Sequence, residues 1–158
     1  MMLSLEEIEI ALARFFNYRQ NIIMPNFYIE HECDLLILRK TGYAVEVEIK
    51  RSLADMKNDF KKKHNHESNK IAEFYYAFPT SIADKCSPLV PDHAGILVVS
   101  YGYNGYLKVV CIKSPKRNKQ ARKWAKEEIE KVLRYSVYRI WNLKRVLARY
   151  KKKENANK

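Results

Sequence analysis

The sequence lacks several features that would each define a class of protein. It has no apolar run near the roughly 20 residues that a membrane-spanning helix needs, and no signal-peptide pattern opens it. Its three cysteines, Cys33, Cys86 and Cys111, form an odd and widely spaced set. Such a set is a poor basis for a disulfide framework and fits a reducing compartment. We therefore expect a cytoplasmic protein without a membrane partner.

The histidines and cysteines also lack the spacing of a zinc site. Strong zinc motifs draw their ligands from close pairs such as C-x2-C or H-x3-H. No such pair occurs among the candidate ligands His31, Cys33, His64, His66 and His93. Buried cysteines and surface histidines are the simpler interpretation of these residues.

Acidic residues are few compared with basic ones. Thirty Lys+Arg against eighteen Asp+Glu give the 158-residue chain a formal net charge of +12 at pH 7. This surplus favours a polyanionic partner, with DNA as the leading candidate and RNA left open. Hydrophobic residues make up 47% of the chain, which is enough for one domain with a buried core.

The spacing of apolar residues alternates between helix and strand patterns, which predicts an α/β fold. A capping box from Ser4 to Glu7 precedes a helical pattern that runs to about Asn17, and Ser52 caps a second helix. Strands are expected over residues 33–39, 43–49, 72–78, 94–100 and 106–112. The sequence therefore predicts a mixed central sheet of about five strands flanked by helices.

The C-terminal third has no glycine or proline after Pro115, which predicts a long basic helical segment. A capping residue followed by proline, Ser114-Pro115, is typical of a helix start. We therefore expect a core over residues 1–113 and a helical extension over 114–150 packed on the same domain. The remaining residues, 151–158, are expected to be a disordered basic tail.

Ionisable residues stand among apolar ones in two neighbouring predicted strands. Side chains of one parity share a face of a strand, so Glu46, Glu48 and Lys50 point to the same side. The valine and isoleucine residues between them point to the other side. A row of charged groups is therefore expected along one face of the sheet.

The loop over residues 40–42 determines which side chains face each other across the hairpin. Its Lys-Thr-Gly sequence suits a three-residue loop closed by Arg39 and Tyr43. The opposed pairs are then Asp34 with Glu48 and Glu32 with Lys50. Directly opposed side chains have Cβ atoms about 4.5–5.5 Å apart. A register shift of one residue would place these pairs on opposite faces.

Two carboxylates held that close repel each other unless a cation lies between them. Mg²⁺ or Mn²⁺ suits Asp34 and Glu48, because a magnesium site uses one or two carboxylates and takes further oxygens from water and phosphate. Lys50 could then hold or help deprotonate a bound water and offset charge on the reacting phosphate. The alternative is a solvated polar face with acids and lysine interleaved. That alternative fits less well, because Asp34 begins an apolar run and Glu48 has apolar neighbours.

These residues resemble the PD-(D/E)XK nuclease superfamily. The resemblance rests on E-C-D at 32–34 before a hairpin and V-E-V-E-I-K at 45–50 leading into a helix. A narrower similarity to MmcB-like proteins associated with DNA repair rests on E-I-K-R-S at 48–52, A-D at 54–55, Asp59 and F-Y-Y-A-F-P at 74–79. It runs from about residue 30 to 100. Cys33 departs from the proline in the name of the motif.

The resemblance implies a restriction-endonuclease-like core in which Asp34 and Glu48 bind metal and Lys50 is catalytic. Glu9 and the backbone carbonyl of Ile49 are further candidate metal ligands. Supporting roles are expected for Glu32, Glu46 and Ser52. Small nucleases of this kind often act on branched DNA in repair or recombination and often dimerise, so a homodimer is an open expectation.

Basic residues near this motif and further along the chain are candidate phosphate contacts. They are Arg51, Lys61, Lys62, Lys63, Lys70, Lys116, Arg117 and Lys119. The sequence thus favours a Mg²⁺- or Mn²⁺-dependent DNA endonuclease. The alternatives are a catalytically inactive nucleic-acid-binding module of the same fold and a basic adaptor that binds protein.

Overall fold

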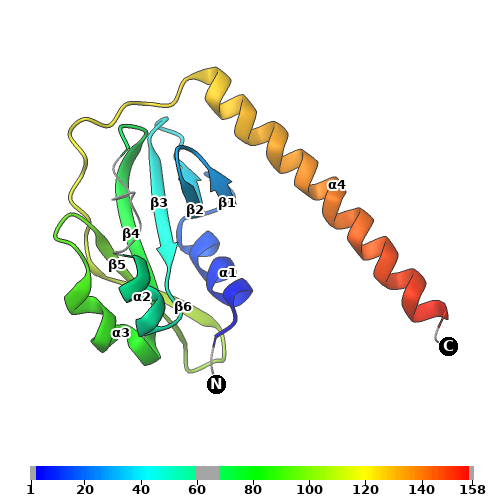
Figure 1. The fold of residues 1–158 in the computed structure, drawn as a ribbon, viewed down its shortest axis with the longest axis horizontal. Coiled ribbons are helices and arrows are strands. Elements are labelled where there is room, and N and C mark those ends of the chain that lie inside the picture. Colours follow the sequence, from blue (N-terminus) through cyan, green and yellow to red (C-terminus); the bar gives the residue numbers. More distant parts are fainter. Residues whose placement is uncertain (1–2, 60–67, 157–158) are drawn as a thin grey trace. The chain divides into compact units, whose positions relative to one another are not determined.

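The computed structural model describes residues 3–59 and 68–156 (Figure 1). The chain divides into two compact units, Met1–Lys123 and Trp124–Lys158. The first unit is an α/β structure built on a six-stranded mixed sheet, which confirms the expected fold class. Within the described ranges, no helix combines the length and the hydropathy that crossing a bilayer requires.

The strands follow one another across the sheet in chain order, from β1 to β6. The outer pairs β1–β2, β2–β3 and β5–β6 are antiparallel, and β3–β4 and β4–β5 are parallel. The strands are β1 Ile22–Tyr28, β2 Glu32–Leu38, β3 Ala44–Ile49, β4 Ile71–Pro79, β5 Gly95–Tyr101 and β6 Leu107–Lys113. The helices are α1 Leu5–Phe15, α2 Leu53–Asp59, α3 Thr80–Cys86 and α4 Lys126–Ala156, with a 3-10 turn at Ser87–Leu89.

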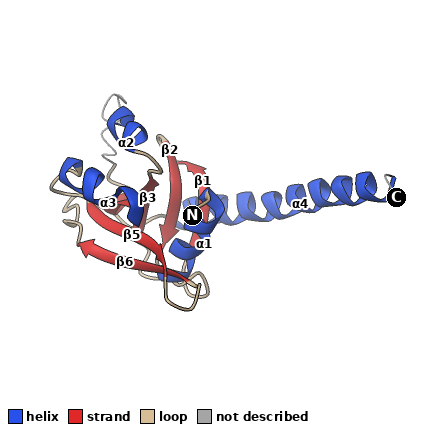
Figure 2. Ribbon diagram, turned by 90° about the horizontal axis from the view of Figure 1, so that it is seen from below, coloured by secondary structure: helices blue, strands red, loops and turns tan. Residues whose placement is uncertain are grey.

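The central strands are buried on both faces, because helices cover each side of the sheet (Figure 2). On one face α1 packs its buried residues onto side chains of β3 that include Val47 and Ile49. On the other face Met56 of α2 packs with Tyr76 and Phe78 of β4. Glu46, Glu48 and Lys50 have the opposite parity to Val47 and Ile49. They therefore lie on the α2 side of the sheet.

The hairpin between β2 and β3 has the register that its loop sequence predicts. The Arg39 amide donates to the Tyr43 carbonyl at 3.0 Å, and Gly42 adopts the left-handed conformation with φ +86°. Four residue pairs extend the same register along the hairpin, from Leu38 opposite Ala44 to Leu35 opposite Val47. The paired residues end there, and one further step in the same register would set Asp34 opposite Glu48.

Both predicted helix caps are present. The Ser4 hydroxyl accepts from the Glu7 amide at 3.1 Å, and the Glu7 carboxylate accepts from the Ser4 amide at 2.8 Å. At the start of α2 the Ser52 hydroxyl accepts from the Asp55 amide at 3.0 Å. Three residues separate the end of β3 from the start of α2. The last residue of α2, Asp59, lies back beside that end of the strand, where it contacts Lys50.

The prediction that a helix begins at Ser114-Pro115 is wrong, since α4 begins at Lys126. Residues 114–123 instead run in an irregular path beside the start of β4. The Asn118 amide donates to the Ala72 carbonyl, and the Arg122 amide donates to the Asn69 carbonyl. These tertiary bonds satisfy backbone groups that a helix would have paired locally.

The expected disorder of the basic tail also differs from the structure. Residues 151–156 continue α4, and the last two residues lie outside the described part of the chain. Lysine is a good helix former, and cations near a helix C-terminus interact favourably with the helix dipole. A run of three lysines at 151–153 is therefore compatible with helix to its end.

Candidate active site

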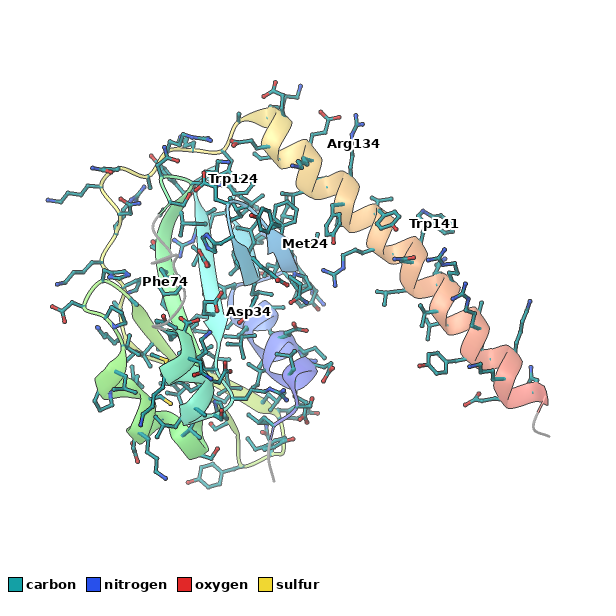
Figure 3. The ribbon with its side chains drawn as sticks, in the orientation of Figure 1. Met24, Asp34, Phe74, Trp124, Arg134 and Trp141 are labelled. Atoms are coloured by element: carbon teal, nitrogen blue, oxygen red, sulfur yellow. The ribbon has the colours of Figure 1, made fainter. Side chains whose placement is uncertain are left out.

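The hairpin brings together the three residues on which the nuclease hypothesis depends. Asp34, which is labelled in Figure 3, directs its carboxylate at the neighbouring strand, where Oδ2 accepts from the Ile49 amide at 2.8 Å. Ile49 lies between Glu48 and Lys50, so the carboxylate of Asp34 sits beside the E-x-K segment. The predicted juxtaposition of Asp34 with the end of β3 is therefore present.

Lys50 is a buried lysine held by two acids. Its Nζ donates to Oε2 of Glu48 at 2.8 Å and to Oδ1 of Asp59 at 2.7 Å. Lys50 is 2% exposed, Glu48 1% and Asp59 4%. A buried charge is costly unless it is paired and hydrogen-bonded, and this ammonium meets both conditions.

Asp59 and Tyr76 complete this group from neighbouring elements. Asp59 is the last residue of α2, three residues after the buried Met56 and on the same side of the helix. Its Oδ2 accepts from the hydroxyl of Tyr76 on β4 at 2.6 Å. We call Glu48, Lys50, Asp59 and Tyr76 the lysine network. It ties the end of β3 to α2 and β4.

The environment keeps Lys50 positively charged. Burial alone would lower the pKa of Lys50, but the Glu48 carboxylate and the hydrogen bond to Asp59 outweigh it and raise the pKa above the ordinary 10.5. Burial and the same aspartate raise the pKa of Tyr76, so its hydroxyl remains a donor. Since the folded-state pKa of Lys50 is raised, its stabilising effect is fully present below pH 10.5. The effect is lost as the pH rises through the folded-state value.

A second buried contact, between a histidine and an acid, lies next along β3. Nε2 of His31, in the bend between β1 and β2, is 2.7 Å from Oε1 of the fully buried Glu46. Glu46 and Glu48 share a face of β3, two residues apart. The α2 side of the sheet therefore carries Glu46, Glu48 and Asp59 together with two basic side chains, His31 and Lys50.

Cys33, which stands at the variable position of the motif, is a structural residue. It is fully buried, and its thiol donates to the Phe27 carbonyl at 3.1 Å. Burial, reinforced by the charges of Glu46 and Glu48, raises its pKa far above the ordinary range. The thiol therefore stays protonated and is unsuited to act as a nucleophile or as a metal ligand.

The residues expected to support the site are not all placed with it. Glu32 is exposed and pairs with Tyr28 on β1, while the Ser52 hydroxyl is used as the cap of α2. Glu9 is half-buried on α1, the helix that packs against the opposite face from the lysine network. Glu46 does lie in the row of acids. The role of Glu9 as a ligand stays a prediction.

The basic candidates fall in two places. Arg51 is exposed immediately after β3, next to the lysine network. The second place is the irregular segment beside the start of β4, which carries Lys116, Arg117 and Lys119. Lys70 lies close to it, directly before the first residue of β4. The remaining three, Lys61, Lys62 and Lys63, fall outside the described residues.

An open cavity of about 630 Å³ adjoins this second basic group. Lys116, Arg117, His93 and the buried Phe74, labelled in Figure 3, contribute to its wall. Phe74 lies directly beside Glu46 in the parallel β3–β4 ladder. Through Phe74 the cavity therefore adjoins the strand position of Glu46.

The donor set of the site suits a hard divalent cation. Asp34 and Glu48 supply carboxylate oxygens, and the adjacent Ile49 carbonyl is a further oxygen donor. In the described parts of the chain, however, no three His, Cys, Asp or Glu side chains gather into a group arranged to hold a metal ion. Glu48 instead directs one oxygen at Lys50. The oxygen ligands are therefore of the kind that Mg²⁺ or Mn²⁺ prefers. To bind the ion, the Glu48 carboxylate would have to contact both the metal and the Lys50 ammonium.

His31, Asp59 and Tyr76 had no role in the site predicted from the sequence. His31 entered only as a candidate zinc ligand, and Asp59 and Tyr76 only as part of the MmcB-like resemblance. For Asp59 a signal existed, because an acid three residues after Met56 falls on the apolar side of a short helix. Tyr76 shares strand parity with Phe74 and Phe78, so its pattern is that of a core residue. His31 precedes β2 in a bend, and its sequence surroundings carry no comparable signal.

Comparison with known proteins supports the fold alone. No family model and no curated protein matches the chain. A solved structure, the SPO1766 protein of unknown function from Silicibacter pomeroyi, superimposes with a TM-score of 0.67 at 17% sequence identity. The alignment covers 91% of this chain and 94% of that one. At this identity the similarity establishes a shared architecture and carries no activity.

The lysine network predicts that Lys50→Met destabilises the protein strongly. The substitution leaves two buried carboxylates without their common cation, and breaking one side of a buried pair typically costs about 3–5 kcal/mol. Urea unfolding followed by circular dichroism at pH 7 measures the change in the free energy of unfolding.

The matched control is Arg39→Met, which breaks the more exposed Arg39–Glu73 pair and should cost about 1 kcal/mol or less. The triple variant Lys50→Met, Glu48→Gln and Asp59→Asn should recover part of the lost stability, because it also removes the uncompensated charges. A single Lys50→Met variant as stable as Arg39→Met would refute the network.

Proposed function

We propose that this protein is a metal-dependent endonuclease that hydrolyses phosphodiester bonds in DNA. The observation that carries the proposal is the hydrogen bond from the Ile49 amide to Asp34. It holds one carboxylate beside the strand segment that supplies Glu48 and Lys50. The resemblance of these residues to the PD-(D/E)XK motif gives the same assignment independently of the distances.

Asp34, Glu48 and the Ile49 carbonyl are the residues that would hold Mg²⁺ or Mn²⁺. Such an ion, when bound, polarises a phosphate oxygen and lowers the pKa of a coordinated water. The protein supplies rigid positions for its ligands. Asp34 is oriented by the Ile49 amide, and Glu48 is fixed on a central strand that is buried on both faces.

Lys50 acts in this proposal as a fixed positive charge. Its raised pKa makes it a poor proton acceptor at neutral pH, so its contribution is electrostatic. An ammonium group at this position can donate to the attacking water and stabilise negative charge that develops on the phosphate. Asp59 and Tyr76 position Lys50 by holding it from the side of α2.

The proposed substrate class follows from charge and from the arrangement of basic residues. Arg51 lies beside the network, and Lys116 and Arg117 line the cavity along the sheet. Lys119 lies on the same irregular segment. Phosphate contacts of this kind give salt-dependent binding without reading sequence. We expect the substrate to be DNA, with RNA as the alternative that the assay below includes. We expect the protein to act in the cytoplasm, in DNA repair or in the processing of branched or damaged strands.

One observation favours a rival function, a nucleic-acid-binding module of the same fold that lacks catalysis. The ammonium of Lys50 is already paired with an oxygen of Glu48, which a metal ion would also need. A second pair, with Asp59, helps to keep the ammonium in this place. In such a module without catalysis, which we call the silent module, the lysine network would serve only to stabilise the fold. The two functions differ in whether a divalent cation competes successfully for Glu48.

Calorimetric titration with Mn²⁺ tests the metal site. We expect saturable binding to the wild-type protein and a loss of at least tenfold in affinity for Asp34→Asn, because one of two carboxylate ligands is removed. The exposed Asp84→Asn variant on α3 is the control and should bind as the wild type does. Absence of binding, or equal binding in Asp34→Asn, would reject the site.

Cleavage assays test the reaction itself. The protein with Mg²⁺ or Mn²⁺ should cut at least one member of a panel of duplex, single-stranded, flap and four-way DNA, with matching RNA included. Glu48→Gln and Lys50→Ala should each lower the rate at least 100-fold. The assay is run at a temperature at which circular dichroism shows the destabilised Lys50→Ala variant to be folded, and there this variant should retain DNA binding. Binding without cleavage in the wild type, on every substrate, would favour the silent module.

A further inference from the structure

A basic segment without any acid lies against the start of β4. Residues 113–123 read KSPKRNKQARK and hold six lysines and arginines. The segment is irregular, but three of its backbone amides, at Lys116, Asn118 and Arg122, donate to the carbonyls of His93, Ala72 and Asn69. The side-chain amide of Asn118 adds bonds to the Ser68 and Ile71 carbonyls, both at 3.1 Å. The cations are therefore carried on a backbone whose path is already held by the sheet.

Neighbouring acids offset only part of this positive charge. Asp92 lies 3.6 Å from Lys116, and both side chains are largely exposed, so this pair contributes little. Two further acids, Glu73 and Glu30, are paired with Arg39 and Lys70. With these two cations the group has eight positive charges against three negative ones, which leaves a net charge of +5. A polyanion is the class of ligand that such a surface favours.

The open cavity of about 630 Å³ lies beside this segment and is lined by groups that suit a nucleobase. Phe74, labelled in Figure 3, is buried, and its ring centroid lies 6.2 Å from that of the exposed His93. Asn69 and Gln120 also line the cavity, and a side-chain amide can offer both donors and an acceptor. Proteins bind unpaired bases through such aromatic rings and through hydrogen bonds to the base edge.

A cation is held in place at the wall of the same cavity. Arg117 lines the cavity, and its Cζ lies 4.4 Å from the ring centroid of Tyr43, which closes the β2–β3 loop. The Nζ of Lys123 lies 5.8 Å from the same ring. A positioned guanidinium can bind a phosphate through two parallel hydrogen bonds. The cavity thus combines groups for a base with a group for the phosphate attached to it.

The cavity and the lysine network lie on the same face of the sheet. Phe74 packs with Met56 on the α2 side, and it precedes Tyr76 of the network by two residues on β4. Two strand residues span about 7 Å, which corresponds to about two stacked nucleotides at roughly 3.4 Å each. A nucleotide bound in the cavity would therefore place nearby phosphates of its own strand at the level of Glu48.

We propose that this cavity binds the base of an unpaired nucleotide in a DNA strand, while Arg117 and the neighbouring cations bind the phosphates of that strand. The inference rests on the proposed function for the choice of DNA, and it adds a substrate class, DNA with a bulged or otherwise unpaired nucleotide. Paired bases stay stacked inside the duplex, so fully paired DNA would reach the cations alone. Six cations on one segment exceed what one phosphate needs, which favours a nucleotide within a strand over a free nucleotide.

Fluorescence anisotropy with labelled oligonucleotides, in EDTA so that no cleavage occurs, measures this preference. A duplex with one bulged nucleotide should bind the full-length protein at least about fivefold more tightly than the fully paired duplex, because one stacked base contributes that much or more. An abasic nucleotide at the bulge keeps the phosphate and removes the base, so it should abolish the preference. Equal affinity for the paired, bulged and abasic duplexes would overturn the proposal.

Variants on the wall separate the base from the phosphate. His93→Ala should weaken binding of the bulged duplex by about fivefold or more and leave the paired duplex unchanged, whereas His93→Phe keeps an aromatic ring and should retain the preference. Arg117→Ala should weaken both duplexes alike and lower the salt slope by about 1. The matched control is Arg14→Ala, an exposed arginine on α1 over the opposite face, which should change neither. Wild-type binding of the bulged duplex by a folded His93→Ala variant would contradict the assignment of the cavity.

Competition with deoxyadenosine monophosphate distinguishes a nucleotide in a strand from a free one. At a concentration equal to that of the duplex it should leave the bulged duplex bound. Displacement would assign the cavity to a free nucleotide and overturn the assignment to a strand. All these measurements follow binding without a metal ion, so a failed cleavage assay leaves them intact. Equally, loss of the base preference would leave the proposed nuclease reaction standing.

Discussion

The ammonium of Lys50, buried between Glu48 and Asp59, is the interaction on which the rest of the site depends. Glu48 and Asp59 could not stay ionised in the interior without compensating positive charge, because unpaired buried carboxylates are costly. The same ammonium joins β3 to α2 through Asp59, and Asp59 joins α2 to β4 through Tyr76. Removing the lysine would therefore disturb the packing of three elements as well as one charge. The proposed chemistry uses this fixed cation and adds to it a divalent ion at Asp34 and Glu48.

Much of the site could be predicted because local rules determine it. A three-residue loop with Gly42 in the left-handed conformation sets the hairpin register, and strand parity then places Glu46, Glu48 and Lys50 on one face. The caps at Ser4 and Ser52 follow from short-range hydrogen bonds that the sequence displays. The order and direction of the strands required the structure. The first strand was not separated from the second, since Asn26 to Lys50 shows one continuous strand-like composition.

The features that the sequence did not predict depend on contacts between distant segments. Asp59 reaches Lys50 only because α2 folds back over β3. Tyr76 joins them from β4, the strand that follows α2 and pairs with β3. Likewise Ser114-Pro115 has the composition of a helix start, but the backbone bonds of Asn118 and Arg122 to the start of β4 favour an irregular path. Short-range preference is weak compared with such tertiary bonds.

The central claim is that Lys50 remains a buried ammonium ion held by two acids, and its protonation can be observed directly. Proton-detected nitrogen NMR of the Lys50 Nζ, assigned by comparison with Lys50→Arg, follows the side chain as the pH is raised. The account predicts an ammonium signal, slowly exchanging with water, that persists beyond pH 10.5, the ordinary pKa of lysine. A titration midpoint below 10.5 would contradict it, because burial would then outweigh the two carboxylates and Lys50 could not serve as a fixed positive charge.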